Sequence, residues 1–586
     1  TFAKVRQSSR QVLANGPSAG NPFTMTVDPH PAASRQPALK RRTFLQLGAA
    51  AVAASGLSGA ARGQPIPTLA PARSLGKARN LIFLVSDGMS FGTLTLADMF
   101  RRQHDRRASH WVSLFGQPGV RRGLYATHAA NSLVTDSAAS GTAWGCGHRV
   151  NNGAVNISPD GTQRLPLLVQ AAQFGKATGL ATTTRLTHAT PASFIANIPR
   201  RDWEKPIAQQ MLDRKLDIGL GGGGNFFHDD MLAAATDVHV VRDRSALLEA
   251  ASAPMPAGRG RLLGLFARSH IPFELDRPAT VPTLAEMTRA ALTFLDRKPE
   301  GFVLQIEGGR VDHAGHSNDA ASIVREQLAF DDAIAEVLRY INIDGGSSRR
   351  DDTLVIITTD HGNGNPGLTL YGPDGRDGFD RLAKVKRSFE WLWDELHVVV
   401  PGKRPEVAPR LITEGMGIEL DEEDRAVLTA ALSSKRVAPF REMSKFEQVL
   451  GGLLANHFGV SFVSGNHTSD YVEVTALGPG SEDLRPTGHN TDLHDLAVQS
   501  LALGPGRLLD DMKDRIDMPS PPRPDCRVSG ASASHAGPAG DHQHQPRLAR
   551  RGNRRAVKHK RQRVRPAVAH ARDKALAPLE PVARVG

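Results

Sequence analysis

The chain has 586 residues, 72 Lys and Arg against 60 Asp and Glu, a formal net charge of +12 and two cysteines. This length allows one large domain or several ordinary ones, and two cysteines exclude both a disulfide framework and a cysteine-rich zinc site. The positive charge lies at the ends, since residues 1–77 hold ten Lys and Arg against one Asp and residues 519–586 hold fifteen against four acids. The middle of the chain is therefore acidic, which argues against specific nucleic-acid binding.

An arginine pair marks the N-terminal region. Arg41 and Arg42 precede a weakly apolar, Ala-rich run at 45–54 and small residues up to Ala61. This pattern is typical of a twin-arginine export signal, and the run is too short for a transmembrane helix. We therefore expect residues 1–76 to be an export signal with a disordered leader, recognised by the twin-arginine export machinery, and the protein to be periplasmic or secreted. A basic stretch before an ordinary helix is the alternative.

Apolar runs and helical patterns alternate through the middle of the chain. The clearest apolar runs are NLIFLVSDG (80–88), GFVLQIEGG (301–309) and DTLVIITTDHG (352–362). Continuous Val, Ile, Leu and Phe runs predict strands that are buried on both faces, and the amphipathic stretch 327–340 predicts a helix between two of them. The pattern predicts an α/β fold with a large, mostly parallel central sheet flanked by helices on both faces.

One segment breaks this alternation. Residues 367–464 carry the charged, helix-like stretch DEEDRAVLTAALSSKR, and we interpret them as an insertion that forms a crown or lid. The α/β core is then made of residues 77–366 and 465–518. Residues 519–586 are rich in Pro, Arg, His and Ala without an apolar period, so we expect a disordered basic tail. Such a tail is either simply solvated or bound to an anionic surface.

Metal-binding side chains follow each of these predicted strands. They are Asp87, then Glu307 with Asp312 and His316, and finally Asp360 with His361. Because the carboxyl ends of parallel strands meet at one edge of a sheet, we expect these side chains to lie together. Clustered carboxylates repel one another unless cations neutralise them. The sequence therefore predicts a metal centre held by oxygen and imidazole ligands.

The types and spacing of these ligands favour particular metals. Asp312 and His316 are four residues apart, which places them on one face of a helical turn. A carboxylate combined with imidazole suits Zn²⁺, whereas a set of Asp, Glu and Thr oxygens suits Mg²⁺. His467, in GNHTSDY, adds another imidazole before a β-like run, although it is a weak signal by itself.

Ser137 stands beside Asp136 at the head of the small-residue stretch VTDSAASGTAWG. A purely structural role is one interpretation, because Asp and Ser both cap the start of a helix. Next to a metal centre, metal coordination and the helix dipole both favour a serine alkoxide, so Ser137 is the candidate nucleophile. We expect the small residues after it to let the helix start lie close to the site. Arg200 and Arg201, in NIPRRDW, offer guanidinium donors for an anion such as phosphate, and a surface pair is the alternative.

Taken in chain order, the motifs SDG, TDSAAS, THATPASF with RRDW, IEGGRVDHAGH, TTDHGNG and GNHTSDY resemble those of bacterial alkaline phosphatases. The resemblance spans about residues 80–505. It implies an exported enzyme that hydrolyses small phosphate monoesters through a phosphoserine intermediate, with two Zn²⁺ and one Mg²⁺ as cofactors. A homodimer is left open.

The resemblance also implies roles for the matching residues. Ser137 would be the nucleophile and a metal contact. Arg201 would clamp phosphate, while Arg200 matches a variable neighbour. Beside it, we expect Asp136 to support the site by orienting Arg201 or a nearby amide and not to act as a base. The zinc that activates water would be held by Asp312, His316 and His467, the zinc that activates Ser137 by Asp87, Asp360 and His361, and the third ion by Asp87, Thr190 and Glu307 with His188 nearby. Histidine occupies two positions that vary in the family, His188 and His313, so the third ion is Mg²⁺ or Zn²⁺.

Two other functions stay open. A phosphodiesterase of the same superfamily would accept a second ester group and would usually lack the arginine clamp. A non-enzymatic exported protein that binds metal or phosphate would show no turnover when loaded with metal. A sulfatase is disfavoured, because Ser137 is followed by Ala-Ala-Ser and not by the x-Pro-x-Arg setting that sulfatases use.

Overall fold

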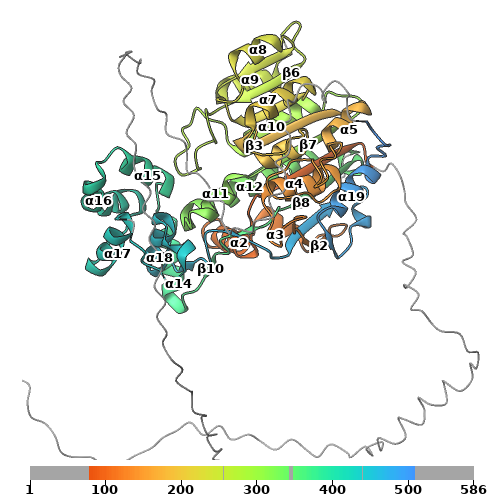
Figure 1. Ribbon diagram of the computed structural model, residues 1–586. Coiled ribbons are helices and arrows are strands. Elements are labelled where there is room, and N and C mark those ends of the chain that lie inside the picture. The colour runs from red at the N-terminus through yellow and green to blue at the C-terminus, as the bar shows by residue number, and fades with distance from the viewer. Residues whose placement is uncertain (1–77, 255, 342–347, 434, 439, 508–586) are drawn as a thin grey trace, which may run out of the picture. The chain divides into compact units, whose positions relative to one another are not determined.

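The computed structural model describes residues 78–254, 256–341, 348–433, 435–438 and 440–507 (Figure 1). The predicted export signal at 1–76 and the predicted basic tail at 519–586 lie outside these residues, so both stay predictions. Among the described residues, none of the helices combines the length and the apolar character needed to cross a bilayer.

The central sheet of the described residues has ten strands in the order β14-β2-β13-β8-β1-β7-β3-β4-β6-β5. Their bounds are β1 (Asn80–Val85), β2 (Arg121–Ala126), β3 (Ala177–Arg185), β4 (Ile218–Gly222), β5 (Val238–Val241), β6 (Arg261–Leu265), β7 (Phe302–Glu307), β8 (Thr353–Thr358), β13 (Val472–Leu477) and β14 (Thr487–His489). Strand β13 runs antiparallel to its neighbours β2 and β8, and every other pair is parallel. The prediction of a mostly parallel sheet is confirmed.

The three predicted strands are β8, β1 and β7, neighbours near the middle of the sheet. Every residue of β1 is buried, and successive residues such as Ile82 and Phe83 belong to different apolar clusters, because side chains alternate between the faces of a strand. Val85 lies opposite Glu307 on one side and Thr358 on the other. The three strands therefore end at the same edge of the sheet.

Helices cover both faces of the sheet. One apolar cluster joins side chains of α2, α3, α9, α10 and α12, and the other joins side chains of α4, α5, α6, α7, α8 and α19. The bounds are α2 (Phe91–His104), α3 (His110–Leu114), α4 (Ser137–Cys146), α5 (Leu167–Gln173), α6 (Ala189–Ser193), α7 (Glu204–Asp213), α8 (Asp229–Ala234), α9 (Arg244–Ser252), α10 (Leu284–Leu295), α11 (Arg310–His316), α12 (Ala320–Ile341), α13 (Ser348–Asp352) and α19 (Asp492–Ser500).

The helix predicted at 327–340 lies within α12, which begins earlier than the amphipathic pattern indicated. The Asp319 carboxylate accepts hydrogen bonds from the backbone N–H groups of Ala321 and Ser322, at 3.1 and 3.0 Å. This cap satisfies donors that a helix start leaves free, so the helix extends toward α11.

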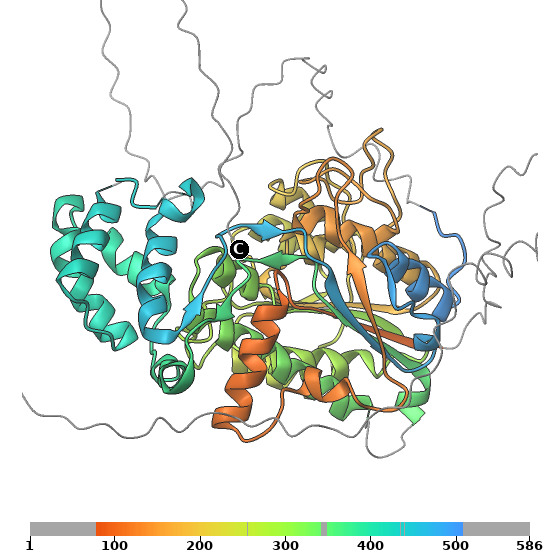
Figure 2. The ribbon, with the colours of Figure 1, turned by 90° about the horizontal axis from the view of Figure 1, so that it is seen from below.

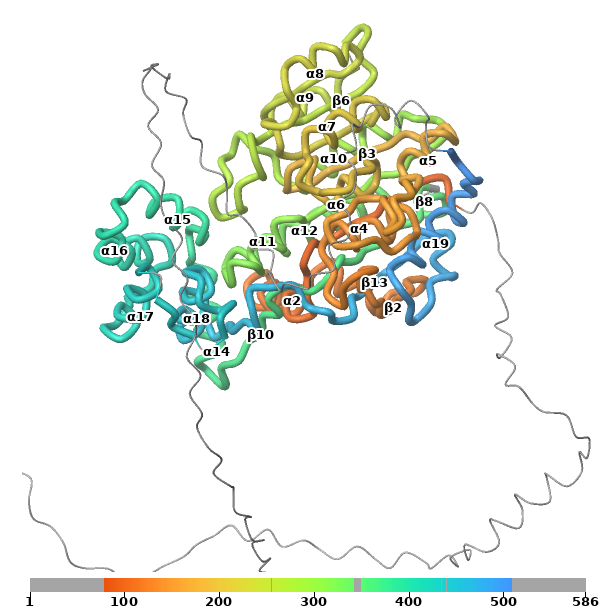
Figure 3. The backbone as a smooth tube through the Cα atoms, in the orientation of Figure 1, coloured from red at the N-terminus to blue at the C-terminus, as the bar shows by residue number. Residues whose placement is uncertain are grey.

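The predicted insertion contains a group of helices beside the sheet (Figures 2 and 3). They are α14 (Gly372–Leu382), α15 (Phe389–His397), α16 (Arg404–Met416), α17 (Glu422–Leu432) and α18 (Phe446–Phe458), with the 3₁₀ turns η1 (Pro401–Lys403) and η2 (Arg441–Ser444); η3 (Ser481–Asp483) lies after β13. Strand β10 (Gly367–Leu368) pairs antiparallel with β11 (Val460–Ser461), which joins the two ends of the segment. Its role as a crown or lid, and the boundaries drawn at 367 and 464, stay predictions.

The insertion contacts the core close to the end of α11. The backbone N–H of Phe389 donates to Asp319 Oδ2 at 2.8 Å, and Gln448 Nε2 donates to the backbone oxygen of His316 at 2.5 Å. Arg325 Nη2 donates to the backbone oxygen of Ala383 at 3.0 Å. Parts of the insertion that are distant in sequence thus lie against α12 and the C-terminal end of α11, which carries predicted metal ligands.

Candidate active site

Four side chains at the carboxyl ends of β1, β7 and β8 form what we call the inner group. Its members are Asp87, Glu307, Asp360 and His361, each fully buried. His361 Nε2 lies 2.9 Å from Asp360 Oδ2 and 3.8 Å from Asp87 Oδ1. Thr190 Oγ1 donates to the other oxygen of Asp87 at 3.1 Å. The strand ends bring together the acids that the sequence predicted to meet.

The inner group carries more negative charge than the protein itself neutralises. Burial raises the pKa of Asp87 well above its usual value, and the charges of Asp360 and Asp312 raise it further. Burial also raises the pKa of Glu307, to about 7. Asp87 Oδ1 and Glu307 Oε1 accept no hydrogen bond from the described residues. Buried, unpartnered carboxylate oxygens are suitable ligands for a cation.

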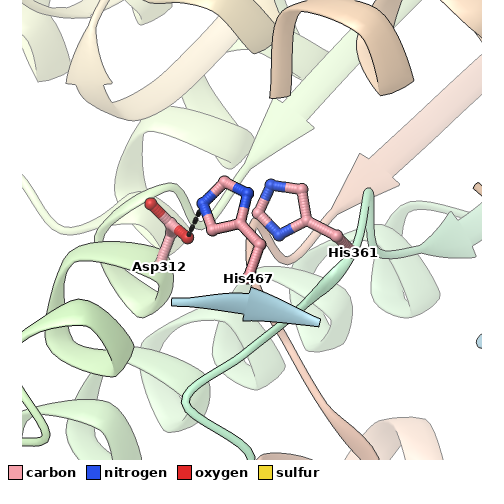
Figure 4. Close-up of side chains that lie close together, drawn as sticks. All are labelled: Asp312, His361 and His467. Carbon is pink, nitrogen blue, oxygen red and sulfur yellow. Dashed lines mark ion pairs between the residues drawn. The ribbon is translucent and has the colours of Figure 1, made fainter. Parts of the chain in front are cut away.

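A second set, the outer group, consists of Asp312, His316 and His467. His316 Nε2 lies 3.4 Å from Asp312 Oδ2 and 3.0 Å from His467 Nε2, and His467 Nε2 lies 3.5 Å from Asp312 Oδ1. Figure 4 shows Asp312 on α11, His467 on the short strand β12 (His467–Thr468), and His361 beside them. One carboxylate and two imidazoles therefore converge, which is a donor set that suits Zn²⁺.

Backbone carbonyl groups orient the two imidazoles of the outer group. The Nδ1 atom of His316 lies 2.8 Å from the backbone oxygen of Gly465, and that of His467 lies 2.9 Å from the backbone oxygen of Thr135. A carbonyl oxygen only accepts, so each Nδ1 carries a proton and each Nε2 is the atom that faces Asp312. Burial lowers the pKa of His316 to about 4, which keeps this ring neutral.

Strand pairing places the outer group against the inner group. Strand β12 pairs antiparallel with β9 (Gly362–Asn363), directly after His361, with His467 opposite Asn363. The rings of His361 and His467 are stacked at 3.6 Å between centroids. Asn363 Nδ2 also donates to Asp312 Oδ1 at 2.7 Å. The sequence analysis missed Asn363, although its place in TTDHGNG, two residues after a candidate ligand, was a usable signal.

Within the described residues, three sets of side chains have ligand atoms within 4.8 Å of one another. The sets are Asp87, Asp360 and His361; Asp312, His361 and His467; and Asp87, His188 and Glu307. The first is a predicted zinc set. The second joins His361 to two members of the outer group, and the third adds His188 to two predicted ligands of the third ion. Asp87 belongs to two sets, as a bridging residue should.

Ser137 is the first residue of α4, and its Oγ lies 3.4 Å from His361 Nε2. Asp136 caps this helix, because one of its oxygens accepts from the backbone N–H of Ala139 at 2.9 Å. Asp136 therefore caps α4 while Ser137, the next residue, lies beside His361. Further along the helix, a side chain at Gly145 would meet the backbone oxygen of Ser193 at 2.2 Å, so this glycine lets α4 pack against α6. That the small residues let the helix start lie close to the site stays a prediction.

Arg201 points its guanidinium toward the serine end of the site. Its Nη1 donates to Asp136 Oδ2 at 3.2 Å, and its Nη2 donates to His188 Nε2 at 2.9 Å. Asp136 therefore contacts both Arg201 and backbone amides, the two kinds of partner that the sequence left open for it. Arg200 instead forms a long, exposed ion pair with Asp202 at 3.8 Å, which is the surface alternative considered for the arginine pair.

A cluster of histidines lies beside His188, and one member was not foreseen. The ring of His270 lies 5.6 Å from that of His188 and 4.4 Å from that of His313. Burial, followed by the charge of His313, lowers the pKa of His270 well below its usual value. His270 follows β6 in a stretch without a ligand motif, so the sequence offered no signal for it.

Comparisons with known proteins fit this geometry. The alkaline phosphatase family profile matches residues 78–503. The chain belongs to the alkaline phosphatase family. It is 28% identical over 435 residues to alkaline phosphatase 3 of Bacillus subtilis, covering 71% of this chain and 87% of that protein. The repressible alkaline phosphatase of Saccharomyces cerevisiae is 34% identical over 320 residues, 49% of this chain and 55% of the yeast protein.

A solved structure shows the same fold. The crystal structure of Thermus thermophilus alkaline phosphatase matches with a TM-score of 0.67 and 31% identity, covering 76% of this chain and 96% of that one. The family prediction and the α/β fold prediction are confirmed, and the chain is a phosphomonoester hydrolase of this family. The roles of its individual site residues stay predictions.

Proposed function

We propose that this phosphatase is exported and hydrolyses small phosphate monoesters through a phosphoserine at Ser137. The observation that carries the proposal is the position of Ser137 Oγ, 3.4 Å from His361 Nε2. His361 belongs to two of the candidate ligand sets. The nucleophile therefore lies where the inner and outer groups meet.

The donor sets fit two Zn²⁺ and a third ion, Mg²⁺ or Zn²⁺. One zinc would be held by Asp312, His316 and His467. The other zinc would be held by Asp87, Asp360 and His361. The third ion would be held by Asp87, Glu307 and Thr190, with His188 beside them. When bound, these ions supply positive charge to the oxygens that enter and leave phosphorus. The unpartnered oxygens of Asp87 and Glu307 support this assignment.

In the first step, Ser137 Oγ gives up its proton to solvent and forms a bond to phosphorus while the bond from phosphorus to the alcohol oxygen breaks, and that oxygen takes a proton from solvent. Arg201, held by Asp136 and His188, donates hydrogen bonds to non-bridging phosphate oxygens. The N-terminal end of α4 favours the negative charge that gathers beside Ser137.

In the second step, a water oxygen attacks the same phosphorus from the side that the alcohol left. The bond between phosphorus and Ser137 Oγ breaks, the serine regains a proton, and inorganic phosphate departs. Positioning and charge stabilisation supply most of the rate of such a transfer. The chain therefore needs a held serine, a phosphate clamp and oriented ligands, which the described residues provide.

The test uses zinc- and magnesium-loaded enzyme and a labelled aryl phosphate monoester. Wild-type protein quenched in acid should carry labelled phosphate on Ser137, and Ser137→Ala should carry none and lose turnover while its metal content is unchanged. Ser132→Ala, on the same loop, is the matched control. Chelation should abolish turnover, and an aryl phosphate diester should react far more slowly. Labelled phosphate on Ser137→Ala contradicts the proposal.

Export is supported by the arginine pair and the apolar run at 45–54. Replacing Arg41 and Arg42 by Lys in the full chain should keep phosphatase activity in the cytoplasm of a bacterial host with a twin-arginine system. The unchanged chain should deliver it to the periplasm or medium. Equal delivery by both chains contradicts this mode of export.

A further inference from the structure

An ion pair links the insertion to the helix that carries the outer group. Oε2 of Glu390, on α15, lies 2.6 Å from Nη2 of Arg310, the first residue of α11. The Arg310 side chain is 3% exposed and that of Glu390 is 49% exposed. A buried guanidinium requires a compensating charge, and within the described residues Glu390 is the carboxylate that pairs with it.

The other side of Arg310 contacts a histidine of the site. Its Nη1 lies 2.7 Å from Nδ1 of His313, and its guanidinium lies 3.7 Å from the centroid of the Phe273 ring. A guanidinium carries only N–H donors, so His313 Nδ1 must accept. A ring that accepts at Nδ1 is neutral and carries its proton on Nε2.

The remaining donor of His313 points away from Arg310, because Nε2 lies across the ring from Nδ1. The His313 ring lies 5.7 Å from that of His188, which accepts a hydrogen bond from the phosphate clamp Arg201. A neutral ring with Nε2–H beside the clamp can donate to an ester oxygen or to a water that replaces it.

We infer that Glu390 is a positioning residue of the insertion, which holds Arg310 so that His313 keeps Nδ1 as an acceptor and presents its N–H donor through Nε2. This inference rests on the proposed function, because it concerns how substrate oxygens are received. It also gives the insertion a chemical effect on the site, transmitted through two hydrogen bonds from α15 to α11.

The alternative is that Glu390 only fastens the insertion to the core. Other contacts do that independently, namely the bonds of Phe389 to Asp319 and of Gln448 to His316. Loss of Glu390 should therefore leave the insertion in place and free the Arg310 guanidinium to turn from His313. The two explanations differ in whether the effect of Glu390 passes through His313.

The first experiment compares Glu390→Ala, Glu390→Gln and the control Glu395→Ala, an exposed acid of the same helix, in metal-loaded enzyme. We expect kcat/KM for an aryl phosphate to fall about fivefold in Glu390→Ala, mainly through a higher KM, because a donor that binds substrate and transition state alike acts on KM. Glu390→Gln keeps an acceptor oxygen for Arg310 and should restore most of the loss, and Glu395→Ala should match wild type.

The second experiment repeats Glu390→Ala in a His313→Ala background. If Glu390 acts through His313, its fold effect on kcat/KM should disappear there, since coupled residues are non-additive. An equal fold effect in both backgrounds shows a purely structural role and overturns the inference.

The third experiment needs no turnover. The ¹⁵N signals of His313, assigned by their loss in His313→Ala, should show an accepting Nδ1 and a protonated Nε2 in wild type. In Glu390→Ala the Nδ1 signal should shift, and in Glu395→Ala it should not. Unchanged signals in Glu390→Ala overturn the inference. If wild type hydrolyses no monoester, the proposed function fails, and this readout still decides the role of Glu390.

Discussion

The inner and outer groups are built by different means. The inner group lies at the carboxyl ends of β1, β7 and β8, and all of its side chains are fully buried. The outer group rests on the seven-residue helix α11 and the two-residue strand β12, and its His316 side chain is 29% exposed. A packed sheet fixes the first set, whereas backbone carbonyls and the insertion support the second.

This difference has chemical consequences. Acids dominate the inner group and crowd their charges, so it depends on ions to be stable. Imidazoles dominate the outer group and are held by hydrogen bonds to distant segments, so it depends on those segments to keep its shape. Substitutions in the two groups should therefore have distinguishable effects on the reaction and on metal binding.

The largest effect should follow loss of an inner ligand. Asp360 Oδ1 accepts from the Gly88 N–H at 2.9 Å, and its other oxygen lies 2.9 Å from His361 Nε2. Asp360→Asn should lower kcat/KM on the order of 10³-fold, since a metal-bound oxygen contributes several kcal/mol to the transition state, and no phosphoserine should form.

The outer counterpart is His467→Ala. Because we assign the outer group to the second step, this variant should still form phosphoserine and accumulate it, as acid quench of labelled substrate measures. The exposed Asp230→Asn is the control for both variants. If both site variants trap phosphoserine equally, the division of labour between the groups is wrong.

The next effect concerns the metal-free protein. Burial raises the pKa of Glu307 to about 7. An acid whose pKa is higher in the folded state stabilises the fold at pH values below its unfolded-state pKa. That contribution is lost as the pH rises through the folded-state pKa. After chelation, the contribution of Glu307 to the free energy of unfolding should fall by roughly 3 kcal/mol between pH 4.5 and pH 8. Because buried histidines such as His316 act in the opposite sense over this range, the contribution is read from the difference between wild type and Glu307→Gln.

Urea unfolding of chelated protein at both pH values measures this change. Glu307→Gln should remove this part of the pH dependence, because glutamine carries no ionisable group at that position. The outer-group variant His467→Ala should keep the dependence. A difference between wild type and Glu307→Gln that does not change with pH would falsify the view that this inner acid is left uncompensated.

What could be predicted from the sequence differs in the same way between the inner and outer groups. Continuous apolar runs located β1, β7 and β8, so the acids at their ends and the four-residue spacing of Asp312 and His316 predicted a common site. The sheet order, the antiparallel β13 and the pairing of β12 with β9 arise from contacts between distant segments, which leave no local period. His270 and Gln448 were missed for that reason, since each acts across the fold.

A smaller effect should follow loss of the phosphate clamp. Arg201 is oriented by Asp136 and His188, at 3.2 and 2.9 Å. Among the described residues it forms its ion pair with Asp136, which belongs to neither group. Arg201→Ala should lower kcat/KM by about 30-fold and weaken inhibition by inorganic phosphate, since a bidentate charge-assisted contact is lost. Arg200→Ala, at the exposed neighbour, is the control and should match wild type.

The smallest effect tests the support of the outer group by the insertion. Gln448 Nε2 donates to the backbone oxygen of His316 at 2.5 Å, and a residue behind a metal ligand tunes its affinity. Gln448→Ala should weaken zinc retention about tenfold in competition with a chelator and lower kcat/KM little at saturating zinc. Glu447→Ala, next to it on α18, should retain zinc like wild type. Because Gln448 contacts the outer group and not the inner one, Gln448→Ala should release zinc from the outer group first. Simultaneous loss of zinc from both groups would show that they behave as one unit and would remove the distinction drawn between them.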